Sequence, residues 1–182
     1  PMARRYDTKW QEDGKGKSVV LIHGLGMDRY MWKGQVDGLS RRYRVITYDN
    51  IGHGETEKPV GPYNLTLFAD QVRDVADKAG LDKFALVGFS LGGLIAQTFA
   101  LTHPDQVGAL VIMNAVYDRT PEERTAVIAR ADVIDVEGPN ATVDAALERW
   151  LTPEFRQARP EVEALVRKRV TTNDHKAYAA AY

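Results

Sequence analysis

Four short apolar runs recur along the first two thirds of the chain, each with little polar alternation. They are SVVLIHG (residues 18–24), RVITYDN (44–50), FALVGFS (84–90) and ALVIMNAV (109–116). Such runs, rich in β-branched residues, are typical of strands that are buried on both faces of a parallel sheet. We therefore predict four buried strands, and the segment ARRYDTKW (3–10) can supply one leading strand.

Between these runs the apolar positions change to helical spacing. The pattern predicts helices over residues 31–42, 65–79 and 91–102, with Gly80 and Pro104 marking two of the ends. In the last helix one face gathers Leu91, Leu94, Ile95, Thr98, Phe99 and Thr102. Strands that alternate with helices of this length indicate right-handed crossovers and a doubly wound, mainly parallel α/β sheet.

After Tyr117 the pattern contains helical signals only. Apolar residues share one face over 143–151, and breaks fall near Pro139, Pro153 and Pro160. This favours a helical cap after the fourth buried strand rather than a continued sheet. We predict two parts, an α/β core over residues 1–117 and a helical cap or lid over 118–182.

Composition narrows the class of protein. The 182 residues include 24 Lys plus Arg and 25 Asp plus Glu, so a net charge of −1 gives no general attraction to nucleic acid or to an anionic membrane. Cysteine is absent, which excludes disulfides and thiolate metal sites. No apolar run approaches the roughly 20 residues that span a bilayer. We expect a soluble, cytoplasmic protein.

The segment LVGFSLGG places Ser90 between glycines, where a buried strand turns directly into a helix. A tight strand-to-helix turn strains and exposes the serine, while small residues at 88, 92 and 93 let neighbouring backbone approach. The helix N-terminus adds partial positive charge and free N–H groups. We interpret Ser90 as a catalytic nucleophile; the alternative is a merely structural Gly-Ser turn.

A second glycine-rich loop, HGLG (23–26), leaves another central strand. A loop beside the serine can direct one backbone N–H at a developing oxyanion, and glycines permit the close approach. We predict that the N–H groups of Leu25 and Leu91 form an oxyanion hole. The alternative is an ordinary βα turn with a buried His23, and His23 is in either case expected to be structural.

At this point the chain resembles the α/β-hydrolase superfamily over almost its whole length. The matching segments are VVLIHGLG, Trp32, YDNIGHGET (48–56), LVGFSLGG and THPDQVGALVI (102–112). The resemblance is to small bacterial esterases and lactonases of the 3-oxoadipate enol-lactonase type, and it implies a helical lid. Where that group often carries Arg in an Asp-x-Arg-Gly-x-Gly loop, this chain has Ile51, which we expect to change loop anchoring. His53 in that loop matches a structural position.

The resemblance also implies a triad of Ser, acid and His, whose last two members follow strands beyond the lid. A serine needs a histidine to accept its proton and a carboxylate to orient that histidine. His103 lies about 18 Å along the helix from Ser90, and His175 is in a helical, charged segment. Asp118 occupies a place where some relatives carry the acid, but no histidine accompanies it.

The last buried strand would leave its edge bare, long and hydrophobic, which parallel sheets do not usually tolerate. We therefore expect that the chain is an N-terminal piece of a hydrolase that ends within the lid. A second polypeptide or a missing segment would supply the last strands of the fold, the acid and the histidine.

These observations predict a serine hydrolase that acts on a small carboxylic ester or lactone through an acyl-enzyme on Ser90. Gly24, Trp32, Phe89 and Trp150 are expected to line the substrate pocket, although they could equally be core residues. No metal cluster, dinucleotide fingerprint or phosphate loop is present in the sequence, so no cofactor or metal is expected. The alternative is a ligand-binding or interaction module that keeps the serine without turnover.

Overall fold

A five-stranded sheet forms the centre of the computed structural model, which describes residues 5–182. Its strands lie in the order β1-β3-β2-β4-β5. Their bounds are β1 Trp10–Asp13, β2 Lys17–Ile22, β3 Tyr43–Tyr48, β4 Phe84–Phe89 and β5 Val107–Met113. Strands β3, β2, β4 and β5 pair in parallel, and β1 pairs with β3 in the antiparallel direction. The mainly parallel sheet predicted from the sequence is confirmed.

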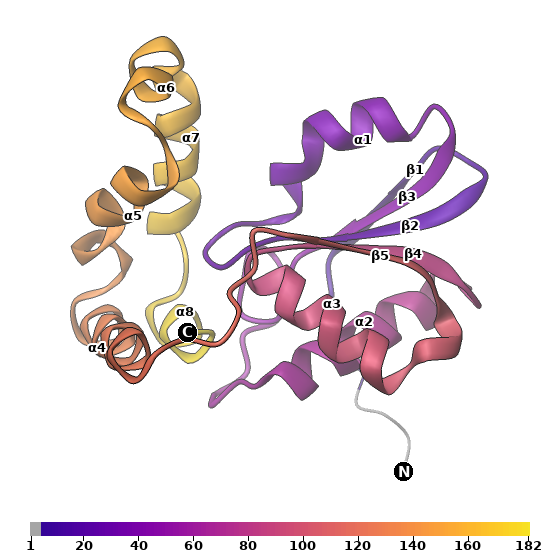
Figure 1. Ribbon diagram of the computed structural model, residues 1–182, viewed down its shortest axis with the longest axis horizontal. Coiled ribbons are helices and arrows are strands. Elements are labelled where there is room, and N and C mark those ends of the chain that lie inside the picture. Colours follow the sequence, from indigo (N-terminus) through magenta and orange to yellow (C-terminus); the bar gives the residue numbers. More distant parts are fainter. Residues whose placement is uncertain (1–4) are drawn as a thin grey trace.

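Helices cover both faces of this sheet, as its alternating side chains require. Val20 and Ile22 belong to the larger apolar cluster, with the buried residues of α2 and α3, whereas Val19 and Leu21 pack with Trp32 on the opposite face. Figure 1 shows α1 on one face and α2 and α3 on the other, so the sheet is doubly wound. The elements are η1 Arg29–Trp32, α1 Lys33–Leu39, α2 Leu65–Lys78, α3 Leu91–Thr102 and η2 Pro104–Gln106.

Strand β5 lies at the edge of the sheet and is poorly covered. The side chains of Leu110, Val111, Ile112 and Met113 are 39% to 46% exposed, in contrast to the fully buried Leu86 on the neighbouring strand. Only β4 pairs with β5 within the described residues. The apolar edge expected from the sequence is therefore present in the structure.

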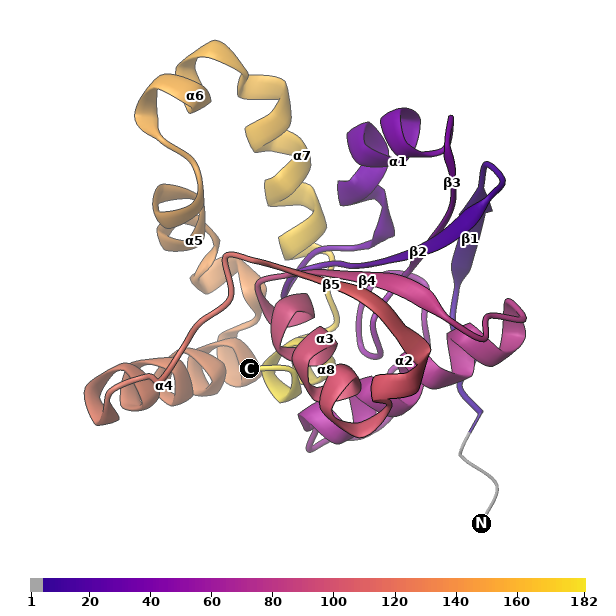
Figure 2. The same ribbon diagram turned by 45° about the vertical axis from the view of Figure 1, so that its right-hand side comes forward.

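The rest of the chain is helical and sits at the carboxyl ends of the strands (Figures 1 and 2). Its elements are α4 Pro121–Glu137, η3 Pro139–Ala141, α5 Val143–Trp150, α6 Pro153–Ala158, α7 Pro160–Thr171 and α8 His175–Ala180. They enclose a second apolar cluster around Ile134, Leu147 and Tyr178, against which Leu25 of the core packs. Among residues 5–182, no helix has the length and apolar character needed to cross a membrane.

Several predicted bounds were wrong, for local reasons. The leading strand lies at Trp10–Asp13 rather than within 3–10, because the extended pairing with β3 begins at Trp10; residues 3 and 4 of that prediction lie outside the described residues. The helix predicted over 31–42 begins as a 3-10 turn, capped by the Asp28 side chain, and ends at Leu39. Strand β5 ends at Met113 because Asn114 has a positive φ of 47°.

Candidate active site

Ser90 occupies the turn between β4 and α3 in a strained conformation. Its φ of 54° and ψ of −116° lie where non-glycine residues are uncommon, at a cost of about 1–3 kcal/mol. The surrounding backbone holds it there: the Ser90 N–H donates to the Met113 carbonyl at 2.9 Å, and the Ser90 carbonyl accepts from the Gly93 N–H at 2.9 Å. The turn therefore presents the serine at the N-terminus of α3.

The glycines around this serine are required by close backbone packing. A Cβ on Gly88 would lie 2.0 Å from the Gly92 carbonyl oxygen, and a Cβ on Gly92 would lie 2.3 Å from the Ile22 carbonyl oxygen. Real Cβ atoms do not approach backbone this closely. The helix α3 thus starts directly against the end of β2, and the turn can be as tight as the serine needs.

The loop that follows β2 runs beside the serine. A Cβ on Gly24 would lie 3.4 Å from the Ser90 Cβ, so Gly24 lies directly beside the serine side chain. The Met27 N–H donates to the Gly24 carbonyl at 3.2 Å, and Gly26, the third residue of this turn, has a φ of 76°. Within the described residues, neither the Leu25 nor the Leu91 N–H donates to a backbone carbonyl.

Two buried histidines, His23 and His53, are hydrogen-bonded to the backbone of this region. His23 donates from Nδ1 to the Gly24 carbonyl, because its Nε2 accepts the Asn50 N–H at 2.9 Å. Burial lowers the pKa of His23 to about 4. Burial, with the neighbouring His23, lowers the pKa of His53 to about 3. Both rings are neutral near pH 7 and serve as hydrogen-bonding supports.

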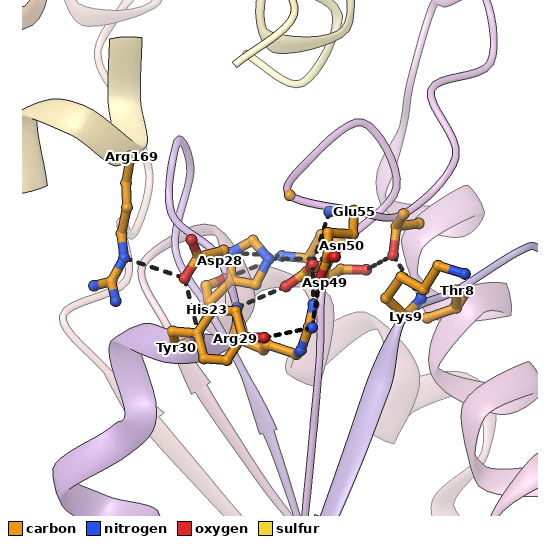
Figure 3. Close-up of polar contacts among 12 residues, drawn as sticks. Thr8, Lys9, His23, Asp28, Arg29, Tyr30, Asp49, Asn50, Glu55 and Arg169 are labelled. Carbon is orange, nitrogen blue, oxygen red and sulfur yellow. Dashed lines mark hydrogen bonds and ion pairs between the residues drawn. The ribbon is translucent and has the colours of Figure 1, made fainter. Parts of the chain in front are cut away.

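A charged cluster ties the loops after β2 and β3 together (Figure 3). The buried Asp49 carboxylate accepts the Arg29 N–H at 2.7 Å and pairs with the Arg29 guanidinium at 2.5 Å. Arg29 also pairs with Glu55. Asp28, which directly precedes Arg29, lies 3.2 Å from Arg169 of α7, so an ion pair connects the helical region to this loop.

The Ser90 turn opens into a cavity of about 540 Å³ between the sheet and the helical region. Its walls include Gly24, Leu25, Phe89, Ser90, Leu91 and Trp150, all of which the sequence singled out. The structure places Trp32 elsewhere: this side chain is 2% exposed and packs against Val19 and Val45 under α1. The prediction that Trp32 flanks the pocket is therefore wrong, because η1 turns its indole into the core.

Three arginines on the cavity wall were missed by the sequence interpretation. Arg119 precedes α4, Arg130 lies on α4 and Arg149 lies on α5, and all three line the same cavity as Ser90. None of them forms an ion pair with a described carboxylate. Among the described lining residues there is no His, Asp or Glu. No local sequence motif predicts these arginines, because they reach the same cavity wall only through the packing of the helices over the sheet.

The remaining titratable candidates are not among the described residues that line the Ser90 cavity. His103 follows the far end of α3, where its ring stacks on Phe99 with centroids 4.7 Å apart. His175 begins α8 beside Gly138. Asp118 has a side chain 79% exposed and lies 3.9 Å from Arg124. The structure thus does not bring these three residues to Ser90.

A serine at a strained turn from a central strand into a helix, on a doubly wound sheet, is the arrangement of the α/β-hydrolase class. Residues 17–152 match the family model described as alpha/beta hydrolase fold. The chain belongs to this family, which confirms the resemblance seen in the sequence.

Two of the similar relatives are named as hydrolases or lactonases. The chain is 34% identical to (E)-2-((N-methylformamido)methylene)succinate hydrolase and 30% identical to 3-oxoadipate enol-lactonase 2, both from Acinetobacter baylyi. These matches cover 87% and 88% of this chain but only 57% and 59% of the relatives. The enol-lactonase from Burkholderia xenovorans superposes with a TM-score of 0.91 at 31% identity, over 96% of this chain and 68% of that one.

Proposed function

We propose that this chain carries the nucleophile of a serine hydrolase that acts on a carboxylic ester or lactone. The observation that carries the proposal is Ser90 itself, held with a positive φ at a helix N-terminus and opening into a cavity. The Ser90 hydroxyl attacks the carbonyl carbon and passes its proton to a base. The alcohol then leaves with a proton, and water hydrolyses the acyl-enzyme.

The Leu25 and Leu91 N–H groups hold the oxyanion in this proposal. Both residues line the cavity beside Ser90, and neither amide is used in a backbone hydrogen bond. Two N–H donors already in place are worth most where charge develops in the transition state. The dipole of α3 adds partial positive charge at the same point.

The acid and the histidine come, we propose, from polypeptide outside residues 1–182. None of the described cavity-lining residues is a His, Asp or Glu. The exposed apolar strand β5 is a surface on which further strands would pair. A second polypeptide or a further segment that adds strands there would also bring groups to the carboxyl end of β5, next to the Ser90 N–H that donates to Met113.

The cavity favours a substrate that carries a carboxylate besides its ester. Arg119, Arg130 and Arg149 line it without carboxylate partners among the described residues, and Leu94, Val127 and Trp150 supply apolar contacts. Arginine matches a carboxylate with two parallel hydrogen bonds. Two relatives are named (E)-2-((N-methylformamido)methylene)succinate hydrolase and 3-oxoadipate enol-lactonase 2, and both names contain a carboxylate-bearing compound, in agreement with such a substrate.

The alternative is a module that binds an anionic ligand and keeps the serine without turnover. The specific observation in its favour is the cavity without a base among its described lining residues.

The deciding experiment is the mass of the purified native assembly, intact and denatured, with and without a fluorophosphonate probe. The proposal predicts a stoichiometric adduct on Ser90 that the Ser90→Ala variant abolishes, together with turnover of an activated ester. The Ser18→Ala variant, in which the serine lies at the start of β2, controls for nonspecific labelling. An assembly that binds ligands but neither labels nor turns over would establish the binding module instead.

A further inference from the structure

The turn that contains Leu25 is fixed by hydrogen bonds to both backbone polar groups of Gly26. The Gly26 N–H donates to Nε2 of the buried His53 at 3.1 Å, and the Gly26 carbonyl accepts Nδ2 of Asn173 at 3.0 Å. His53 comes from the loop after β3. Asn173 lies in the short segment between α7 and α8, 147 residues along the chain from Gly26. The core and the helical region thus each fix one polar group of the same residue.

Asn173 is built into this place rather than resting on the surface. Its side chain is 8% exposed, and Nδ2 also donates to the carbonyls of Arg169 and Val170, at 2.9 Å and 3.0 Å. The amide therefore joins the last turn of α7 to the loop after β2. Because the Asn173 amide is buried, water cannot easily replace a hydrogen bond that is lost there, and the loss costs free energy.

Neighbouring contacts further restrict the turn around Gly26. The φ of 76° and the Tyr178 ring, whose hydroxyl would lie 2.9 Å from a Cβ, admit only glycine at position 26. Two residues later, Asp28 faces Arg169 at 3.2 Å and caps the next turn by accepting the Tyr30 N–H at 2.9 Å. These contacts restrict the backbone conformation of the turn as long as the helical region is packed against the core.

We propose that Asn173 is a positioning residue of the oxyanion hole, so that a helix of the lid region sets the direction of the Leu25 N–H. The inference rests on the proposed hydrolase function. The peptide groups on either side of Gly26 are fixed by His53 and Asn173, and we expect rotation of either to disturb the preceding peptide, which carries the Leu25 N–H. Lifting α7 from the core then weakens stabilisation of the oxyanion without touching Ser90.

The test compares two lid variants in the native assembly. Asn173→Asp keeps the shape but replaces the donating amide by a carboxylate, which faces three carbonyl oxygens. Lys176→Met removes a different, exposed lid contact, the 2.8 Å ion pair between Lys176 and Asp135. Two quantities are measured in each: the rate of Ser90 labelling by a fluorophosphonate, and hydrogen exchange of the Gly26 amide. Thermal melting verifies that each variant is folded, and Asn173→Ala replaces Asn173→Asp if the latter is not.

In Asn173→Asp we expect labelling to slow about ten-fold or more and Gly26 exchange to accelerate, with both unchanged in Lys176→Met. Equal labelling rates in the two folded variants would overturn the proposal, and so would an equal loss in both, which means general loosening of the lid. If the wild-type assembly does not label at all, the proposed function fails. The oxyanion-hole role then fails with it, and Gly26 exchange shows separately whether Asn173 holds the turn: it does if exchange is faster only in the position 173 variant, and it does not if exchange is unchanged.

Discussion

At the scale of single residues, the candidate site depends on strain that its surroundings hold in place. Ser90 keeps an unfavourable backbone conformation because backbone groups of Met113 and Gly93 satisfy its N–H and its carbonyl. Those contacts are possible only because Gly88 and Gly92 let the strand and the helix meet. The serine geometry is thus a property of its neighbours.

A methyl group at position 92 tests this dependence. Gly92→Ala places Cβ 2.3 Å from the Ile22 carbonyl oxygen, so β2 and α3 must separate. We expect a loss of about 1–3 kcal/mol in the free energy of unfolding and much slower labelling of Ser90. Gly34→Ala, in α1 with no neighbour within 4 Å of its Cβ, is the matched control and should gain up to about 1 kcal/mol. Chemical denaturation measures both, and equal stabilities would contradict the packing argument.

The buried histidines predict an acid-sensitive fold. Their pKa values of about 4 for His23 and about 3 for His53 lie below the ordinary 6.5, so the unfolded chain binds protons that the folded one excludes. Stability is therefore full above about pH 6.5 and falls as the pH drops toward 4, by up to about 1.4 kcal/mol per pH unit for each histidine. Denaturation at several pH values measures the slope. His23→Gln should reduce the slope, even if its stability at pH 7 is lower; an unchanged slope would disprove the assignment.

At the scale of elements, the pattern of buried runs predicted every strand from β2 to β5 because such strands carry an apolar signal on both faces. It failed where the structure depends on distant contacts. Strand β1 has the sequence WQED and contains no apolar run. Its pairing with β3 therefore could not be predicted from an apolar pattern. The sequence does not distinguish whether the Trp32 indole faces the cavity or the core. In the structure, the 3-10 turn directs it into the core. The contact between Asn173 and Gly26 has no local signal at all.

The edge strand β5 gives a prediction of its own. Its residues from Leu110 to Met113 are exposed, and among residues 5–182 only β4 pairs with this strand, so its free edge is a template for pairing with another strand. A polypeptide of residues 1–182 alone should self-associate with increasing concentration, as measured by sedimentation velocity. Val111→Lys, on this strand, should reduce the association, whereas Val60→Lys, at a fully exposed loop position, should not. Concentration-independent monomers of the unmodified chain would contradict this.

At the scale of the whole molecule, the cavity lies between two parts of the chain that line it with different groups. The sheet side supplies Ser90 and the Leu25 and Leu91 amides, and the helical side supplies the three arginines on the cavity wall. The two sides are attached at few polar points, the Asp28 to Arg169 ion pair and the Asn173 hydrogen bond among them. Under the proposed function, we therefore expect that replacing a cavity arginine changes substrate selection, whereas a change at Asn173 on the helical side also affects the chemistry.

Charge selection can be measured with two esters of the same shape. In the native assembly, p-nitrophenyl hemisuccinate should have a kcat/KM at least about ten-fold above that of p-nitrophenyl butyrate, which carries a methyl group in place of the carboxylate, since a charge-assisted hydrogen bond is worth about 1.5–3 kcal/mol. Arg130→Gln should remove most of this preference by raising KM for the hemisuccinate, with the butyrate rate unchanged.

Arg124→Gln supplies the control, because Arg124 lies on the same helix α4, pairs with Asp118 and does not line the cavity. It removes the same charge from the same helix, so it should leave the preference intact if direct contact with the substrate carboxylate is the cause. A preference that falls equally in both variants would mean that the long-range field of the helical region attracts the anion. In that case the dependence of kcat/KM on ionic strength should be equally steep in the Arg130→Gln and Arg124→Gln variants. Under direct contact, the salt dependence should weaken only when an arginine of the cavity wall is replaced.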